Sequence, residues 1–199
     1  IFNPVFCSKY SFCEKMRKSS FRGVLRFINV GRLSKQKNQS LLIKAFRGVV
    51  DVYPSSKLSI VGEGELLQDL YRLIEELNLE NNVSLLGMRA DVPDLFAQND
   101  VFVLSSDYEG LPLTILEAEA ASLPIVSTNV GGISDIVENE KNGLLVSPND
   151  ETALTEAMIS MNDESLRMNF GKKSKEIAMP FDVNVFVQKY SKLYREELK

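Results

Sequence analysis

The stretch VLRFINVGRLSKQKNQSLLIKAFRGVV, residues 24–50, carries the pattern that decides the fold. It opens with a short apolar run that ends in Gly31, which is typical of a β-strand followed by a turn. A polar loop comes next. Apolar residues then recur at helical spacing and give a helix one apolar face, made of Leu41, Leu42, Ala45, Phe46, Val49 and Val50. The stretch therefore predicts a strand, a loop and a helix in succession.

The same alternation continues along the chain. Strands are predicted at 57–62, 83–87, 100–105, 124–128 and 143–147, with helical patterns between them, and only helices from Glu151 onward. Several of these strands are continuous apolar runs, as in a parallel sheet that is covered on both faces. Right-handed crossovers then predict an α/β, Rossmann-like, doubly wound parallel sheet of about six strands with helices on both faces.

Three segments follow from this pattern. Residues 1–22 begin without Met and carry Pro4, which indicates a linker or helix arriving from a preceding domain. Residues 23–180 form the expected Rossmann-like domain. Residues 181–199 are expected to form a last helix, with one apolar face made of Phe186, Val187, Tyr190, Leu193, Tyr194 and Leu198.

Composition excludes several classes of function. The chain has 199 residues, 44% hydrophobic and 25% charged, and no histidine, so imidazole catalysis within it is excluded. The spacing of Cys7 and Cys13 matches no metal or redox signature, which favours reduced thiols in a cytoplasmic protein. We find no run of about 18 apolar residues and no signal-peptide core. The net charge of −4 argues against a general nucleic-acid binder.

Basic residues are concentrated near the beginning of the chain. Nine lie between Lys9 and Lys37, against one acidic residue, Glu14, whereas the remainder carries 14 basic and 26 acidic residues. One explanation is a solvated basic face. The other is a positive rim around an anionic small molecule or against an anionic membrane surface. The charge pattern alone leaves both open.

The first strand-to-helix loop is GRLSKQKN, residues 31–38. Ligands of open parallel sheets bind beyond the carboxyl ends of the strands, where this loop should lie. Gly31 allows the backbone to pass close to a ligand, and Arg32 and Lys37 flank a helix that begins near Asn38. Two cations beside a helix N-terminus favour a phosphate site. Solvated loop cations are the alternative.

The loop after the fourth predicted strand is SSDYEGLPLT, residues 105–114. Gly110 and Leu111 lead to Pro112, which is expected in the first helical turn. The backbone amides of Leu113 and Thr114 would then point, unpaired, into the same crevice. Together with the first loop, these amides point to a nucleotide that carries a diphosphate.

Two glutamates frame this helix start. Glu117 lies about one turn inside the helix, where its carboxylate can accept hydrogen bonds from ribose hydroxyls. Glu109 precedes the helix and should lie nearer the reacting end of the ligand. Glu119 is about 200° around the helix from Glu117 and should face elsewhere. Acids that merely stabilise a helix N-terminus are the alternative.

The segments VGRLSKQKN (30–38) and EGLPLTILEA (109–118) together resemble the donor-binding, C-terminal lobe of the retaining GT-B glycosyltransferases, specifically glycosyltransferase family 4. The first matches that family's Gly-Arg…Lys phosphate loop. The second matches its pair of glutamates separated by seven residues. The resemblance extends over nearly the whole chain through NPV (3–5), LLGMRADVPDLF (85–96), ASLPIVSTNVGGISDIV (121–137) and NGLLVSPND (142–150).

The resemblance implies a role for each matching residue. Arg32 and Lys37 would hold the diphosphate and stabilise the leaving group, with Glu109 as the third catalytic residue, in contact with the donor sugar. Glu117 would bind the ribose, and the backbone at two further residues would bind the base. The implied donor-binding set is Gly31, Arg32, Lys37, Met88, Arg89, Gly110, Leu111, Leu113, Thr114 and Glu117.

The implied reaction transfers a glycosyl unit, with retention, from a nucleoside-diphosphate sugar such as a UDP-sugar to an acceptor hydroxyl. Polysaccharide, lipopolysaccharide or glycolipid synthesis is the expected setting. We expect no metal and no other cofactor, since the chain has no Asp-x-Asp triplet. The alternatives are a non-enzymatic nucleotide-sugar-binding module and a GT-B sugar-nucleotide epimerase.

The family's acceptor site lies in an N-terminal lobe, which this chain lacks. We therefore expect a glycan or lipid-linked acceptor to bind through that other lobe, and the helix at 181–199 to cross toward it. The chain alone is expected to be inactive. A cytoplasmic location is expected, without nucleic acid as a partner, and a peripheral contact with the inner face of the cell membrane stays open.

Overall fold

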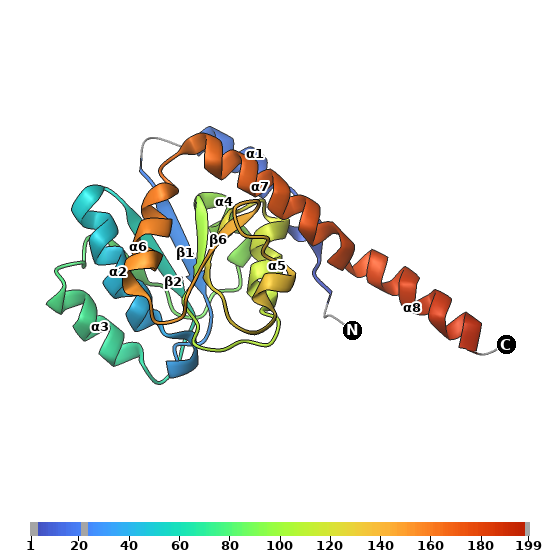
Figure 1. The fold of residues 1–199 in the computed structure, drawn as a ribbon, viewed down its shortest axis with the longest axis horizontal. Coiled ribbons are helices and arrows are strands. Elements are labelled where there is room, and N and C mark those ends of the chain that lie inside the picture. The colour runs from blue at the N-terminus through green and yellow to red at the C-terminus, as the bar shows by residue number, and fades with distance from the viewer. Residues whose placement is uncertain (1–3, 21–23, 198–199) are drawn as a thin grey trace.

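The computed structural model describes residues 4–20 and 24–197 and contains one six-stranded, all-parallel sheet in the order β3-β2-β1-β4-β5-β6 (Figure 1). This confirms the predicted Rossmann-like, doubly wound α/β fold. The strands are β1 (Arg26–Val30), β2 (Lys57–Val61), β3 (Val83–Leu85), β4 (Val101–Leu104), β5 (Ile125–Thr128) and β6 (Gly143–Val146). Each lies within its predicted segment.

Eight α-helices and four short 3₁₀ segments are present in the described ranges. The helices are α1 (Cys13–Ser20), α2 (Gln39–Val52), α3 (Leu67–Glu76), α4 (Val92–Gln98), α5 (Leu113–Ala120), α6 (Glu151–Ser160), α7 (Glu164–Ala178) and α8 (Val183–Glu197). The 3₁₀ segments are η1 (Cys7–Tyr10), η2 (Lys35–Lys37), η3 (Gly131–Asp135) and η4 (Met179–Phe181).

The sheet separates two hydrophobic cores. Successive side chains of a strand point to opposite faces, so Phe27 joins one core and Ile28 joins the other. Helices α2, α3 and α6 cover the first face, and α4 and α5 cover the second. Strands β4 and β5 are buried over their whole length, which explains why both are continuous apolar or small-residue runs rather than alternating ones.

The strand order reverses between β1 and β4. From β1 the chain proceeds outward through β2 and β3, and from β4 it proceeds the other way through β5 and β6. Strands β1 and β4 pair directly, with Phe27 opposite Val101. The loops that leave their carboxyl ends, residues 31–38 and 105–112, are therefore neighbours at the switch point, where open α/β sheets bind ligands.

The N-terminal segment packs onto this domain. The Val5 N–H donates to the Phe181 carbonyl (2.9 Å), and the Val183 N–H donates to the Val5 carbonyl (2.9 Å). Tyr10 and Cys13 are buried in the second core. The segment 1–22 thus contains η1 and α1, while its residues 1–3 and 21–22 lie outside the described part. Its role as an interdomain linker stays a prediction.

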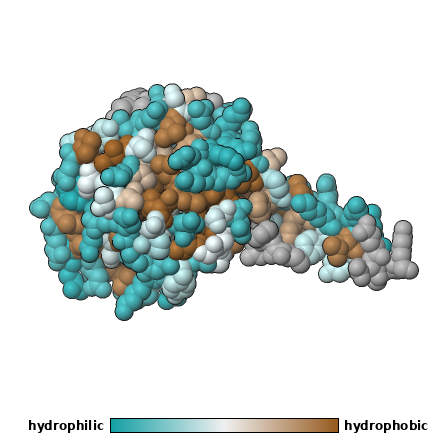
Figure 2. All heavy atoms as spheres, in the orientation of Figure 1, coloured by the Kyte–Doolittle hydropathy of each residue, from teal (hydrophilic) through white to brown (hydrophobic). Residues whose placement is uncertain are grey.

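Helix α8 extends away from the body of the domain (Figure 1). Its side chains Val187, Leu193 and Tyr194 are 54%, 60% and 66% exposed, and apolar patches alternate with polar ones along it (Figure 2). The predicted crossing toward another lobe stays a prediction, and Leu198 lies outside the described residues. No helix in the described ranges combines the length and the apolar character that a membrane span requires.

Glu119 faces away from the crevice, as its helical position predicts. Its side chain is fully buried, and its Oε1 accepts a hydrogen bond from Asn142 Nδ2 at 2.8 Å. Asn142 Oδ1 in turn accepts from the Glu138 N–H at 2.7 Å. Burial raises the pKa of Glu119 well above its ordinary value, and the bond from Asn142 only partly opposes this rise.

This raised pKa makes the stability of the fold depend on pH. The unfolded chain releases the Glu119 proton near pH 4.3, whereas the folded chain retains it to higher pH. The contribution to stability is therefore complete below about pH 4 and falls as pH rises toward the folded pKa, by at most about 1.4 kcal/mol per pH unit.

We expect Glu119→Gln, which has no proton to lose, to gain stability relative to the wild type as pH rises. Urea unfolding between pH 4 and pH 8 measures the difference. Glu156→Gln, at an exposed position of α6, is the matched control, and its free energy of unfolding should change with pH as that of the wild type does. The same pH dependence of the free energy of unfolding in Glu119→Gln and the wild type would contradict the assignment of a buried, protonated carboxyl.

Candidate functional site

The two loops at the switch point are joined by hydrogen bonds. The Asp107 N–H donates to the Gln36 carbonyl (2.8 Å), and Gln36 Nε2 donates to the Tyr108 carbonyl (3.0 Å). Asn38 Nδ2 reaches Asp107 Oδ1 (2.8 Å), and Ser105 Oγ donates to the Asn38 carbonyl (2.9 Å). The loops therefore form one connected rim. Sequence reasoning missed these four contacts because no local spacing relates residues so far apart in the chain.

Lys37 and Glu109 meet across this rim. The Nζ of Lys37 lies 2.5 Å from Oε1 of Glu109, and the two side chains are only 17% and 6% exposed. Ser106 Oγ donates to the same carboxylate oxygen at 2.7 Å. A lysine ammonium carries three N–H donors. Lys37 can therefore hold Glu109 and still donate to an anion in the crevice.

The loop after β5 fixes the backbone of Glu109 from the other side. Gly131 has φ +57°, and a Cβ there would lie 1.9 Å from the Glu109 carbonyl oxygen. The neighbouring Gly132 N–H donates to the Gly110 carbonyl at 2.8 Å. Two glycines are needed here because the two backbones touch directly. Both belong to the family-like stretch 121–137, where no local sequence pattern indicates this role.

Arg32 occupies a different position from Lys37. Its side chain is 75% exposed, and its Nη2 lies 3.4 Å from Oε2 of Glu65. The backbone beneath it is fixed by the β2–α3 loop, where a Cβ on Gly62 would lie 2.0 Å from the Gly31 carbonyl oxygen. The two predicted phosphate ligands are thus on one loop, with the Lys37 side chain largely buried against Glu109 and the Arg32 side chain largely exposed to solvent.

Helix α5 begins at the rim without a side-chain cap. It starts at Leu113, and Pro112 is the extended residue before it (φ −73°, ψ 113°) rather than a member of the first turn, which corrects the predicted position by one residue. The N–H groups of Leu113 and Thr114 donate to no other described residue. Within the same ranges, the buried Oγ1 of Thr114 also lacks a hydrogen-bond partner. Free donors at a helix N-terminus favour an anion.

Glu117 lies farther along α5 and is half-buried. Its carboxyl group lies beside the Tyr10 hydroxyl and near the Lys9 cation. Burial raises the pKa of Glu117, while Tyr10 and Lys9 oppose this rise. Burial, and then the neighbouring Glu117 carboxylate, raises the pKa of Tyr10. The N-terminal segment therefore reaches the acid that the sequence predicts for ribose.

Met88 and Arg89 follow β3, at the carboxyl ends of the strands, where the two switch-point loops also lie. Met88 is 75% exposed. The guanidinium group of Arg89 binds both carboxylate oxygens of Asp91, at 2.8 and 2.6 Å. The Gly62 N–H donates to the Gly87 carbonyl (2.9 Å), which ties this loop to the β2–α3 loop. In the described part of the chain, no hydrogen bond or ion pair joins either residue to the Lys37–Glu109 pair.

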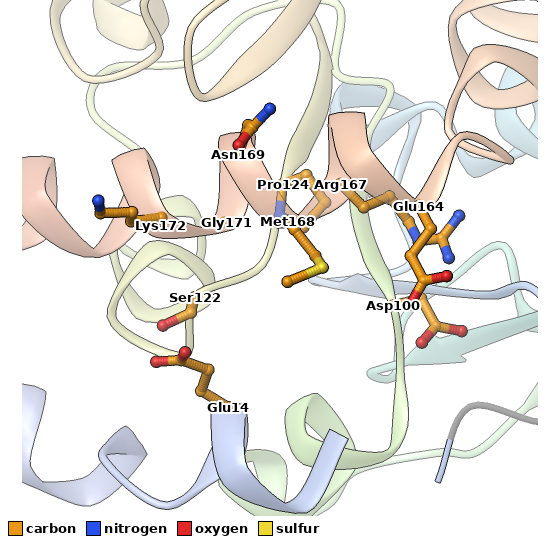
Figure 3. Close-up of a pocket in the computed structure, with 10 residues that line it drawn as sticks. All are labelled: Glu14, Asp100, Ser122, Pro124, Glu164, Arg167, Met168, Asn169, Gly171 and Lys172. Carbon is orange, nitrogen blue, oxygen red and sulfur yellow. The ribbon is translucent and has the colours of Figure 1, made fainter. Parts of the chain in front are cut away.

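A pocket of about 360 Å³ lies at the other end of the strands, opposite the two switch-point loops. Asp100 and Pro124, which line it, directly precede β4 and β5. Arg167, Glu164 and Asp100 gather at one end of this pocket, and Glu14 from α1 faces it from below (Figure 3). The pocket is therefore at the amino ends of the strands, away from the residues that the sequence predicts to be functional.

Comparisons with known proteins address the family and the fold of this chain. The model of the family "Glycosyl transferases group 1" matches residues 13–177. An uncharacterized glycosyltransferase of Methanocaldococcus jannaschii is 35% identical over 90% of this chain and 52% of its own length. The UDP-Gal:alpha-D-GlcNAc-diphosphoundecaprenol alpha-1,3-galactosyltransferase of Escherichia coli is 36% identical over 84% of this chain and 44% of its own length.

A solved structure shows the same fold. The Anabaena protein HepE, crystallised with UDP and glucose, superposes with a TM-score of 0.86 at 26% identity, over 98% of this chain and 56% of its own. This agreement confirms the expected Rossmann-like lobe of a GT-B fold. The chain spans about half the length of the curated relatives it matches. With a family model that matches most of its length, this chain belongs to the glycosyl transferases of group 1.

Proposed function

We propose that this chain is the donor-binding lobe of a retaining glycosyltransferase of family 4, which moves a glycosyl unit from a UDP-sugar to an acceptor hydroxyl. The observation that carries the proposal is the Lys37–Glu109 pair beside the uncapped start of α5 at the switch point. The Escherichia coli relative, named for its UDP-Gal donor, and the Anabaena structure, a complex with UDP and glucose, support this choice of donor.

The diphosphate would bind between the first loop and α5. The free donors of Lys37, the amides of Leu113 and Thr114, and the Arg32 guanidinium supply the positive charge there. Departure of UDP develops negative charge on the phosphate oxygens, and fixed donors stabilise this charge without having to reorganise. In this proposal cations and amides, rather than a metal ion, neutralise the leaving group.

The two glutamates would bind opposite ends of the donor. Glu117 would accept hydrogen bonds from the ribose hydroxyls, and the exposed backbone at Met88 and Arg89 would contact the base. Glu109, fixed beside Lys37, would contact the donor sugar near its reacting carbon.

The acceptor in this proposal is a glycan or lipid-linked glycan that binds to a second, N-terminal lobe. The share of its relatives that this chain covers supports such a division, and so does the lipid-linked acceptor in the name of the Escherichia coli relative. Polysaccharide, lipopolysaccharide or glycolipid synthesis at the cytoplasmic face of the membrane would follow. Without the second lobe, the chain should bind the donor but not transfer its sugar.

Substituting Glu117 and Glu109 by glutamine, one at a time, tests the proposal. We expect Glu117→Gln to weaken binding of UDP about tenfold or more, because it loses hydrogen bonds to a charged group. Glu109→Gln should leave UDP affinity nearly unchanged but impair transfer by the complete enzyme. Calorimetry on this chain and a transfer assay on the complete enzyme measure these effects, with Glu156→Gln as the control. The reverse ordering of the two variants would refute the assigned roles.

A further inference from the structure

Ser106 makes a contact that the proposed function does not use. It is the second residue after β4, its side chain is fully buried, and its Oγ donates to Oε1 of Glu109 at 2.7 Å. Lys37 Nζ approaches the same oxygen. Both hydrogen bonds that the described residues make to this carboxylate therefore converge on Oε1, and neither involves Oε2.

The backbone around Ser106 is fixed by the neighbouring strand. Its carbonyl oxygen accepts a hydrogen bond from Thr128 Oγ1 at 2.7 Å, and both residues are buried. Three residues farther on, the Glu109 carbonyl lies against Gly131. The short loop from Ser106 to Glu109 is therefore fixed at both ends. A rigid backbone of this kind allows the serine hydroxyl to orient the neighbouring carboxylate.

Lys37 alone restrains the orientation of the Glu109 carboxylate less strictly. Its ammonium group sits on a flexible four-carbon stem and would also serve the diphosphate. A hydroxyl that bonds only Glu109 keeps its orientation when Lys37 turns toward a bound phosphate. The Ser106 hydroxyl has few rotamers and, among the described residues, donates to Glu109 alone, so it is the more specific restraint.

We infer that Ser106 is a positioning residue for Glu109, one that holds Oε1 so that Oε2 is presented to the donor sugar. This inference rests on the proposed function. It concerns the sugar end of the donor only. Loss of the hydroxyl should therefore reduce the contribution of the sugar to binding and leave the nucleotide end unaffected.

The test compares UDP with UDP-glucose, UDP-galactose and UDP-N-acetylglucosamine by calorimetry on this chain. We expect Ser106→Ala to change the Kd of UDP less than twofold and to weaken the tightest-binding UDP-sugar about tenfold. Ser127→Ala is the matched control. It removes an equally buried hydroxyl from β5 that donates only to the Thr128 carbonyl, and it should change neither Kd.

A double-mutant cycle separates positioning from general damage to the loop. In a Glu109→Ala background, Ser106→Ala should weaken UDP-sugar binding no further. An equal loss in both backgrounds, a parallel loss of UDP binding, or a wild type that binds no UDP-sugar more tightly than UDP would overturn the inference. A wild-type chain that fails to bind UDP at all would instead refute the proposed function itself.

Discussion

Gly131→Ala is expected to lower the free energy of unfolding by about 2–5 kcal/mol and to remove detectable UDP binding. The left-handed backbone of Gly131 would cost an alanine about 1–2 kcal/mol. Its Cβ, 1.9 Å from the Glu109 carbonyl oxygen, would force two packed loops apart, which adds about 1–3 kcal/mol. Because the displaced loop leads into the start of α5, the Leu113 and Thr114 amides proposed to bind the diphosphate should lose their geometry together with the stability.

Urea unfolding and calorimetry with UDP measure both effects. Gly110→Ala is the matched control for stability, because a Cβ there meets no atom within 4 Å and the backbone has no positive φ. The control should change the free energy of unfolding by less than about 0.5 kcal/mol. Equal stability of the two variants would show that the loop after β5 does not fix Glu109.

Replacing Lys37 is expected to have two separable effects. Lys37→Met leaves the nearly buried Glu109 carboxylate with Ser106 as its remaining partner, so stability should fall by about 3–5 kcal/mol. The double variant Lys37→Met/Glu109→Gln removes both charges and should recover most of this stability. It should not recover UDP affinity, because the phosphate cation is still missing. Recovery of both would place the phosphate elsewhere.

The fold could be predicted largely from the sequence because its strands have a distinctive composition. Segments such as 100–105 and 124–128 are apolar without alternation, and only strands buried on both faces require this. The order of the strands was predicted only as doubly wound. Helix α1 was expected only as part of a linker or helix, because its basic sequence has few apolar residues and its position depends on distant contacts such as Cys13 with Pro93.

The sequence suggests which residues form the candidate site, and those roles stay predictions, but it does not give the contacts between the residues. The sequence places Lys37 and Glu109 on loops after two different strands, and the direct ion pair follows only from the pairing of β1 with β4. Ser106 has no spacing signal of its own. The positive φ of Gly131 likewise depends on the backbone it touches. The fold brings Lys37 and Glu109 together. Arg32 and Arg89 are exposed and pair with other acids, Glu65 and Asp91, and Met88 is exposed.

The rim beside β1 and β4 should bind a nucleoside diphosphate through its phosphates. A calorimetric titration of residues 1–199 with UDP, UMP and uridine tests this binding directly. We expect affinity to fall from UDP to UMP to uridine, and Lys37→Met to weaken UDP binding by about 1.5–3 kcal/mol while uridine binding is unchanged. Arg32→Ala should act in the same direction but less, since its side chain is largely exposed. Lys57→Ala, at the amino end of β2, is the control and should match the wild type. Unchanged UDP affinity in both the Lys37 and the Arg32 variants would contradict the account.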